Sequence, residues 1–310
     1  MPEDQLQAVS VGHVLVDLRV QVDRLPGVDE EAVIRDETRG VGGSAANVAV
    51  VLRRLGIQSG VIGKIGLDDF GRIAVDNLMR EGVVISGLRV SLQDRTGFSI
   101  VVRDREGSIT IYSYKGAAET LEPAELDENI IGKSRHVHVA SLRPDTTLRT
   151  LEIAKKHSTT VSWDPGRVLS RMGAERLATI ISSVDIVFVN REEARNLTGS
   201  HDYRQAARQL IKLGPKIVVV KLGASGSYIL SQDGEAYIPA LKPEKVVDTT
   251  GAGDSYAAGF IAGLLRGYTI EKASLYATIV ASIKVSRLGS NAAPTHEEVV
   301  ERAREIGLEL

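Results

Sequence analysis

Two glycines and a carboxylate lie close together in the segment 247–259 of this chain. Gly251 and Gly253 allow the backbone to turn sharply and allow another molecule to approach it closely. The small residues after Asp254 begin an apolar helical pattern that we expect to continue to Leu265. The start of such a helix presents unpaired N–H groups and the positive end of its dipole. This arrangement binds anions, above all phosphate.

A carboxylate is unusual at a simple anion site, so the position of Asp254 needs an explanation. It fits a site in which the carboxylate accepts a proton from a hydroxyl group that attacks the bound phosphate. We therefore interpret the segment as a centre of phosphoryl transfer, with Asp254 as the general base. The turn 251–254 would be the anion hole, and its other catalytic residues are Gly251, Ala252 and Gly253. The alternative is a plain helix cap, because Asp and Gly are common at helix starts.

Two strings of residues resemble the signatures of one enzyme family. Asp-Thr-Thr-Gly-Ala-Gly-Asp at 248–254, followed by small residues, resembles the C-terminal signature of the ribokinase-like (PfkB) family of sugar and nucleoside kinases. Gly-Val-Gly-Gly-Ser-Ala-Ala-Asn at 40–47 resembles the N-terminal signature of the same family. The resemblance implies that Gly42, Gly43 and Asn47 contact the acceptor sugar.

Asp17 extends the resemblance on the acceptor side. Gly12 and Asp17 are similar to the first-strand pattern in which the family's Asp binds substrate hydroxyls. An ionised carboxylate only accepts hydrogen bonds, and it therefore suits a pair of neighbouring hydroxyl groups.

The nucleotide side is covered by two further strings. Asn-Arg-Glu-Glu at 190–193 resembles the family's Asn-x-x-Glu motif, which orders Mg²⁺, its waters and phosphate. The resemblance implies that Asn190 binds nucleotide and that Glu193 holds Mg²⁺ partly through water, as this ion often requires. The string at 221–226 resembles the nucleotide loop, with contacts from Lys221, Gly223 and Gly226, although the family often has Thr where this chain has Lys221.

Three segments complete the comparison with the family. In many relatives the residue matching Asp248 helps to hold a monovalent cation such as K⁺. The segment 287–291 resembles the loop that packs against adenine and that, in many relatives, helps to hold this cation together with the residue matching Asp248. Asp-Pro-Gly at 164–166 departs from the more usual Asp-Pro-Asn.

The middle and C-terminal parts of the chain alternate between apolar runs and helical patterns. Strands are expected at 136–140, 160–164, 185–190 and 216–222, and helices at 146–157, 174–182 and 203–213. Such alternation predicts an α/β fold with a mainly parallel central sheet and helices on both faces. Ligands of such sheets bind at the carboxyl ends of the strands. Asp69 is expected to cap the helix that follows it.

A small β-sheet lid is expected beside this sheet. Two alternating runs at 98–102 and 108–112 predict a hairpin, and 32–38 has the pattern of an exposed strand. The resemblance implies that about 14–39 and 95–115 form a lid that excludes water from the acceptor. We take 1–310 as a single domain, and the resemblance also allows a homodimer through the lids.

Composition sets limits on partners and compartment. The 310 residues include 43% hydrophobic ones and carry a formal net charge of −2, so no basic field is present to attract nucleic acid. No cysteine is present, which excludes disulfides and thiolate metal sites. The apolar runs, about ten residues at most, are too short to span a membrane, and residues 1–5 are unlike a secretory signal. We expect a cytoplasmic protein.

The predicted function is ATP- and Mg²⁺-dependent phosphoryl transfer to a hydroxyl of a small sugar. The low aromatic content of 4% favours a sugar over a nucleoside. Nucleoside kinase stays open because the string at 40–47 is also similar to nucleoside-kinase versions. Ketodeoxygluconate stays open because Tyr112, Tyr114 and Lys115 loosely resemble kinases of that acid. A sugar-phosphate acceptor, ADP as donor, and a non-enzymatic α/β ligand-binding protein are further alternatives, but the last does not explain Asp254.

Overall fold

The computed structural model describes residues 6–310. The segment 1–5, which the sequence analysis compared with a secretory signal, lies outside the described residues. The strands are β1 (Ala8–Gly12), β2 (Leu15–Val22), β3 (Ile34–Gly42), β4 (Ser59–Gly66), β5 (Val84–Ser91), β6 (Thr96–Arg103), β7 (Ile109–Gly116), β8 (His136–Ala140), β9 (Thr160–Asp164), β10 (Ile186–Asn190), β11 (Ile217–Lys221), β12 (Ser227–Ser231) and β13 (Gly234–Ile238). The helices are α1 (Ser44–Arg54), α2 (Asp69–Arg80), α3 (Glu128–Lys133), α4 (Pro144–Lys156), α5 (Gly166–Ser170), α6 (Ala178–Ile181), α7 (Arg191–Thr198), α8 (Tyr203–Ile211), α9 (Ala252–Leu265), α10 (Ile270–Lys284) and α11 (His296–Glu305).

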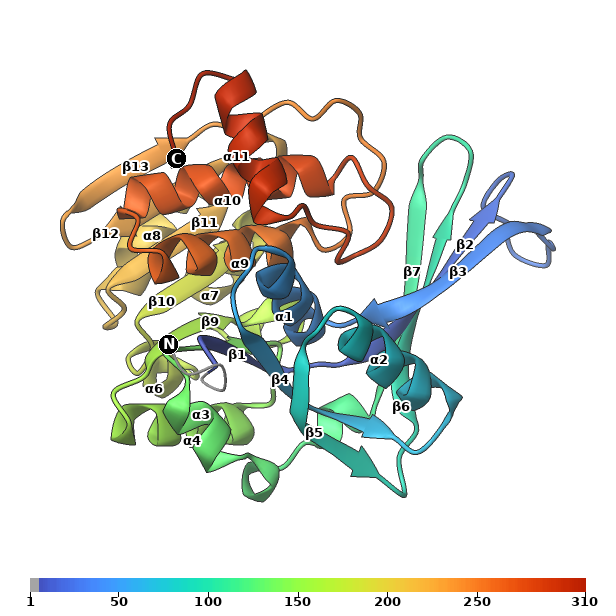
Figure 1. Ribbon diagram of the computed structural model, residues 1–310, viewed down its shortest axis with the longest axis horizontal. Coiled ribbons are helices and arrows are strands. Elements are labelled where there is room, and N and C mark those ends of the chain that lie inside the picture. Colours follow the sequence, from blue (N-terminus) through green and yellow to red (C-terminus); the bar gives the residue numbers. More distant parts are fainter. Residues whose placement is uncertain (1–5) are drawn as a thin grey trace.

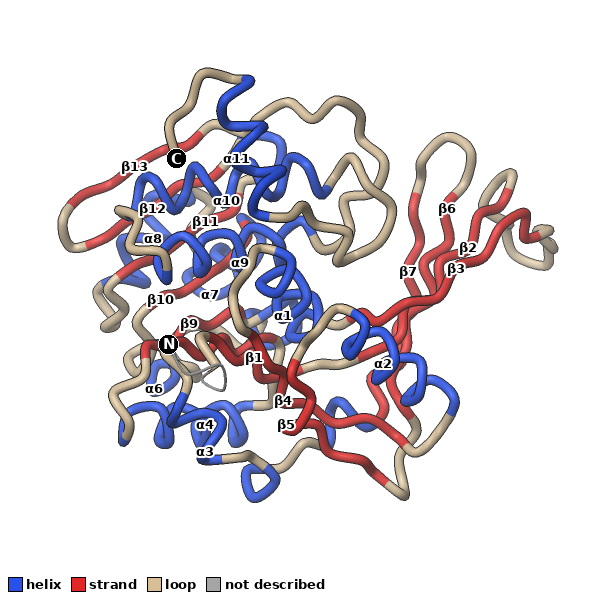
Figure 2. The backbone as a smooth tube through the Cα atoms, in the orientation of Figure 1, coloured by secondary structure: helices blue, strands red, loops and turns tan. Residues whose placement is uncertain are grey.

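The larger of two sheets has nine strands in the order β13-β12-β11-β10-β9-β8-β1-β4-β5. Its neighbours from β11 to β5 pair in parallel, and β12 and β13 form an antiparallel edge. Helices α1, α9, α10 and α11 cover one face, while α3, α4, α6, α7 and α8 cover the other. Figures 1 and 2 show this layering, with the strands running between two sets of helices. The predicted α/β fold class is confirmed.

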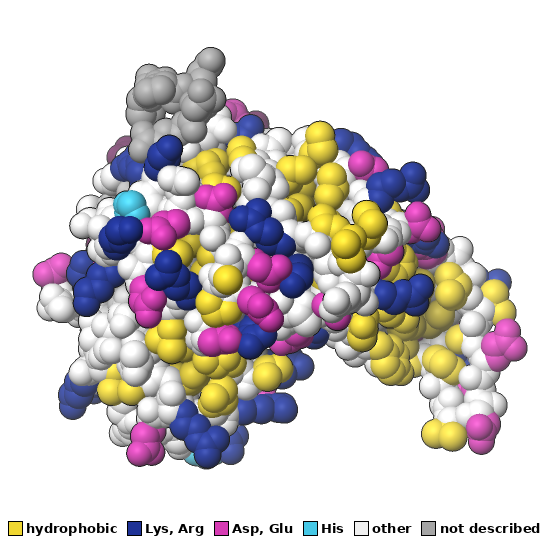
Figure 3. All heavy atoms as spheres, turned by 90° about the horizontal axis from the view of Figure 1, so that it is seen from below, with side chains coloured by type: hydrophobic (Ala, Val, Ile, Leu, Met, Phe, Trp, Pro, Cys, Tyr) yellow, Lys and Arg dark blue, Asp and Glu magenta, His cyan; other side chains and the backbone are white. Residues whose placement is uncertain are grey.

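The smaller sheet, β3-β2-β6-β7, is called the lid sheet below. It is mixed, because β2 pairs antiparallel with β3 but parallel with β6, and β6 and β7 form the expected hairpin. It projects from the body of the molecule (Figure 1), and Figure 3 shows hydrophobic side chains gathered on the projection. Its base is buried against α1 and α2.

Helix α9 is buried on nearly all sides, as its run of small and apolar residues requires. Two of its glycines allow it to pack tightly against α10. A Cβ at Gly259 would lie 2.8 Å from the Cα of Ala277, and one at Gly263 would lie 2.9 Å from the Cα of Ala273. This close packing fixes the position of α9, whose first turn carries the predicted base.

Two local expectations are wrong. The helix expected at 174–182 is limited to α6, because residues 174–177 form turns and the backbone of Leu177, at φ −103° and ψ 9°, is not helical. The cap of α2 is Asp68 and not Asp69, since the Asp68 side chain accepts the Gly71 N–H. Within residues 6–310, no helix combines the length and the apolar character that crossing a membrane needs.

Candidate active site

The predicted base lies in the first turn of α9. Asp254 is partly buried, and its Oδ2 accepts a 2.8 Å hydrogen bond from Nδ2 of Asn47 in α1. Burial raises the pKa of Asp254 to about 6, the Asn47 bond opposes this, and repulsion from Asp164 adds to it. A carboxylate with such a pKa is ionised at neutral pH yet is a stronger base than an exposed Asp.

The turn before α9 depends on a glycine. Gly251 has a φ of 74°, and a Cβ there would lie only 1.9 Å from the carbonyl oxygen of Ser290. The N–H of Ala252 donates to the Thr249 carbonyl oxygen at 3.2 Å and is therefore used within the turn. Within the described chain, the N–H groups of Gly253 and Asp254 make no hydrogen bond, and these two remain available for an anion.

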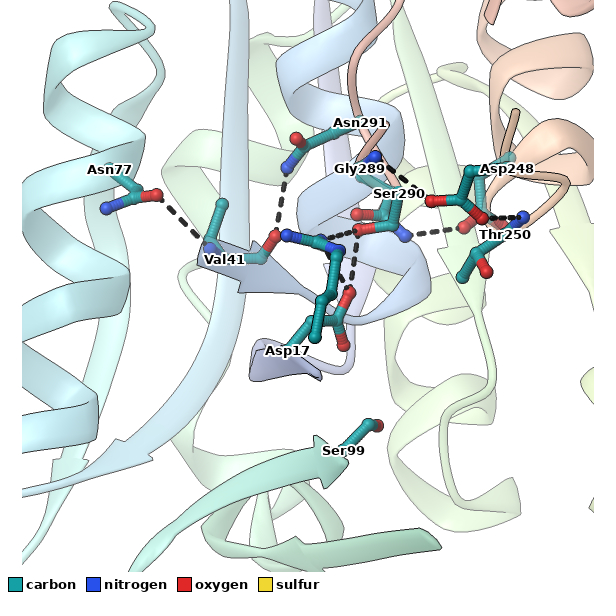
Figure 4. Close-up of polar contacts among 12 residues, drawn as sticks. Asp17, Val41, Asn77, Ser99, Asp248, Thr250, Gly289, Ser290 and Asn291 are labelled. Carbon is teal, nitrogen blue, oxygen red and sulfur yellow. Dashed lines mark hydrogen bonds and ion pairs between the residues drawn. The ribbon is translucent and has the colours of Figure 1, made fainter. Parts of the chain in front are cut away.

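On the acceptor side, the structure brings together the residues that the sequence singled out. Asp17 is almost fully buried on β2, and its Oδ2 accepts hydrogen bonds from Ser290 Oγ at 2.7 Å and from Arg19 at 3.0 Å (Figure 4). A Cβ at Gly42 would lie 2.4 Å from Asp17 Oδ1, so only glycine leaves this carboxylate accessible. Gly43 has a φ of 89° and lies against the carbonyl of His13.

Asn47 has one buried polar atom without a partner. Its Nδ2 is used by Asp254, but its Oδ1 is buried and has no hydrogen bond within residues 6–310. A buried orphan acceptor is costly unless a ligand satisfies it. This atom therefore suits a hydroxyl donor that is bound beside Asp254.

Three neighbouring strands supply polar residues on the nucleotide side. Asp164, Asn190 and Lys221 are the last residues of β9, β10 and β11. Lys221 Nζ lies 2.6 Å from Asp164 Oδ2, and Asp164 Oδ1 accepts the Gly166 N–H at 3.0 Å. The two departures from the family pattern, Lys at 221 and Gly at 166, thus meet on the same Asp164 carboxylate. Burial alone would lower the pKa of Lys221, but Asp164 and Glu193 outweigh it and the pKa is raised.

Asn190 and Glu193 form a reciprocal cap at the start of α7. Asn190 N–H donates to Glu193 Oε2 at 2.8 Å, and Glu193 N–H donates to Asn190 Oδ1 at 2.9 Å. Burial and then repulsion from Asp164 raise the pKa of Glu193 to about 7. No group of three or more metal-binding side chains occurs in the part of the chain that is described. A single buried carboxylate still fits Mg²⁺, which keeps several waters and takes other oxygens from phosphate.

A cavity of about 370 Å³ lies between β11 and helices α9 and α10. Its walls include the expected Lys221, Gly223 and Gly226, together with residues that the sequence analysis missed: Leu241, Pro243, Val246, Thr278, Ala281, Ser282 and Val285. The segment 287–291, for which the resemblance implied a contact with adenine, does not line this cavity. Gly289 and Ser290 contact Asp248 and Asp17 instead.

Arg19 and Lys284 were missed by the sequence analysis, and Ser290 was included only as part of the segment 287–291. Arg19 shares a strand face with Asp17 because it lies two residues further along β2, a signal that was present in the sequence. The contact of Ser290 with Asp17 and that of Lys284 with Asp248 had no such signal, since only the tertiary fold brings these residues together. Lys284 Nζ donates to the carbonyl oxygen of Asp248 at 2.7 Å.

The comparisons with known proteins agree with this geometry. The model of the family described as pfkB family carbohydrate kinase matches residues 5–297. The chain is 36% identical to an ATP-dependent ribose-1-phosphate kinase of Halopiger xanaduensis, over 95% of this chain and 97% of that protein. It is 32% identical to a nucleoside kinase of Methanothermobacter thermautotrophicus, over 97% and 96%. Its fold matches Arabidopsis thaliana ribokinase complexed with ribose and ATP, with a TM-score of 0.86, 26% identity and 96% and 98% of the two chains covered.

Proposed function

The chain belongs to the pfkB family of carbohydrate kinases, a family of phosphotransferases with an alcohol acceptor, and from this premise we propose how its site works. The donor is ATP and the acceptor is a hydroxyl group of a small sugar. The observation that carries the proposal is the hydrogen bond between Asn47 and Asp254. It joins the two signature strings at the start of α9, where free N–H groups can bind a phosphoryl group.

In this mechanism, Asp254 takes the proton of the attacking hydroxyl. Asp17 accepts hydrogen bonds from other acceptor hydroxyls, and the orphan Oδ1 of Asn47 accepts one more. The N–H groups of Gly253 and Asp254 stabilise the charge on the moving phosphoryl group. The lid sheet excludes water, which would otherwise compete as the acceptor.

Lys221 and Glu193 complete the donor side. A Cβ at Gly253 would lie 3.3 Å from Lys221 Nζ, so this ammonium is next to the anion hole and can bind a phosphate of ATP. The apolar cavity beside it would hold the base of the nucleotide. Glu193 would hold Mg²⁺ together with ATP, and the ion would neutralise phosphate charge.

A phosphorylated or acidic sugar is a second candidate acceptor, and Lys115 favours it. Asp17 pairs in register with Ser99, and Ser99 with Ser113, so Lys115, two residues further along β7, lies on the same face of the lid sheet. Lys115 is partly buried and has no ion pair within the described residues. Burial lowers its pKa, against the attraction of Glu119 and Asp17. An anionic acceptor would supply a direct ion-pair partner for the Lys115 ammonium.

A panel of acceptors tests both candidates. Ribose, fructose, ketodeoxygluconate, sugar phosphates including ribose 1-phosphate, and nucleosides are each incubated with ATP or ADP, and phosphorylated product is measured directly. If the acceptor is anionic, Lys115→Met should raise its KM and leave the KM of ATP unchanged. No product with any acceptor would contradict the kinase proposal.

We also propose that the protein forms a homodimer through the lid sheets. Ile109 and Ile111, 37% and 52% exposed, share one face of β7, and Tyr112 and Tyr114, 63% and 47% exposed, share the other face. Exposed apolar side chains gathered in this way mark contact surfaces. Sedimentation should show a dimer that Tyr112→Glu or Ile111→Glu shifts to monomer. Val168→Glu, at an exposed position on α5, is the control, and a native monomer would contradict the proposal.

A further inference from the structure

Helix α10 ends in a lysine with no exposed surface. Lys284 is fully buried, and its Nζ donates a 2.7 Å hydrogen bond to the carbonyl oxygen of Asp248. The same Nζ lies 4.0 Å from Oδ2 of Asp248. A buried ammonium is stable only when it is paired and hydrogen-bonded, so these contacts determine where it lies.

Asp248 is the centre of a small network that holds two loops together. Its Oδ1 accepts the Thr250 N–H at 2.9 Å, and its Oδ2 accepts the Gly289 N–H at 3.0 Å (Figure 4). Gly251 follows directly and packs against the carbonyl of Ser290. The loop that forms the anion hole is therefore fixed through Asp248 to the loop after α10.

The residues around Asp248 do not fit a bound monovalent cation, although the family resemblance led us to expect one. The carbonyl oxygen that would be its ligand already accepts the Lys284 ammonium, and both carboxylate oxygens accept backbone N–H groups. A second positive charge would also lie next to the ammonium and to nearby Arg19, in a buried place where like charges repel strongly.

We propose that the Lys284 ammonium replaces the monovalent cation, and that it holds the Asp248–Gly251 turn in the shape that forms the anion hole. Lys284 is thus a positioning residue, and the protein needs no K⁺. Burial lowers the pKa of Lys284 to about 8, against the attraction of Asp248, and the group is still mainly charged at neutral pH. The structural part of this inference is independent of the proposed function, whereas its effect on turnover rests on that function.

The test compares KCl with N-methyl-D-glucamine chloride at equal ionic strength and pH 7. The two readouts are the thermal midpoint and the rate of phosphorylation. For the native protein we expect the same midpoint and less than a twofold change in rate. Lys284→Ala should lose at least tenfold in rate without K⁺ and recover most of it in KCl or NH₄Cl, with a higher midpoint and bound ²⁰⁵Tl⁺ detected by NMR.

Two further variants distinguish loss of the Lys284 charge from loss of its volume and from loss of a charge elsewhere on α10. Lys284→Met removes the charge but fills the space, so it should be destabilised without rescue by K⁺. Lys272→Ala removes a charge elsewhere on α10 and should behave as the native protein. A variant at 284 that folds only in K⁺ also supports the proposal.

Several-fold activation or stabilisation of the native protein by K⁺ would overturn the inference. So would a Lys284→Ala variant that is folded and active without K⁺. Because the midpoint needs no substrate, a failed kinase assay with a K⁺-rescued midpoint would contradict only the proposed function.

Discussion

Asn47 and Asp254 are joined by a 2.8 Å hydrogen bond although 207 positions separate them in the sequence. The bond connects the first turn of α1 with the first turn of α9, and both helices lie on the same face of the large sheet. The bond holds Oδ2 of Asp254 in place and leaves Oδ1 of the same carboxylate to accept a proton.

Asp254→Asn should separate binding from catalysis. Loss of a general base lowers turnover by roughly 10²- to 10⁴-fold. The amide can still accept from Asn47, so ATP and acceptor should bind with nearly native affinity in calorimetry. Unchanged turnover would remove Asp254 as the base.

The same variant should be more stable than the native protein. Because burial raises the pKa of Asp254 to about 6, ionisation of the folded protein at pH 7 costs roughly 3 kcal/mol relative to an exposed Asp. This cost is fully present above pH 6 and is relieved as the pH falls from about 6 towards 4. The asparagine has no such cost, so its thermal midpoint at pH 7 should rise. Asp233→Asn, in the exposed turn between β12 and β13, is the control and should change neither readout.

Much of this arrangement was predictable from sequence, because periodicity and strand-end residues reflect local rules. β8 and β9 have the expected bounds, and the residues at the ends of β9, β10 and β11 share one edge because parallel strands run in the same direction. The prediction failed at a local detail, as at α6, where residues 174–177 form turns and not the expected helix.

Contacts between distant segments could not be predicted in the same way. Nothing in the sequence near Lys221 shows that its partner is Asp164, and nothing near Lys284 shows that it is buried against Asp248. Such pairs depend on which strands are neighbours and on the tight packing of α9 against α10. The spacing of motifs identified the groups, but only the fold determined their partners.

The pH dependence of the rate should report the ionisation of Asp254. Because its pKa is raised to about 6, kcat/KM should fall as the pH drops below 6, with the protonated form inactive as a base. Asn47 stabilises the ionised form, so Asn47→Ala should shift this acid limb to higher pH as well as raise the KM of the acceptor. Rate profiles from pH 4.5 to 9 measure both effects. A limb that moves to lower pH in Asn47→Ala would contradict the assignment.

Gly251→Ala should damage the anion hole through a steric clash. The new Cβ would lie 1.9 Å from the Ser290 carbonyl oxygen in addition to adopting an unfavourable φ of 74°. Gly267→Ala is a matched control, because its φ is 82° but nothing lies within 4 Å of the added Cβ. We expect Gly267→Ala to cost about 1 kcal/mol of stability with native kcat, and Gly251→Ala to cost more and to lower kcat. Urea unfolding and turnover measure the difference, and equal effects of the two variants would refute the clash.

Glu193→Gln tests the magnesium site without disturbing the helix cap. Gln can form the same reciprocal cap with Asn190 as Glu does, so the thermal midpoint should not fall. Loss of the charge should raise the Mg²⁺ concentration for half-maximal rate by roughly 10-fold or more, as is typical for residues that support a bound metal. Glu192→Gln is the control, because Glu192 is the exposed neighbour in the same turn.

The pH dependence of the Mg²⁺ requirement gives a second readout for Glu193. Its pKa is raised to about 7, first by burial and then by repulsion from Asp164, so protons compete with the ion near neutral pH. The native requirement for Mg²⁺ should therefore fall as the pH rises from 6 to 8, while that of Glu193→Gln should stay constant over this range. If both proteins show the same Mg²⁺ requirement at every pH, then Glu193 only caps α7 and the ion is held by phosphate and water alone.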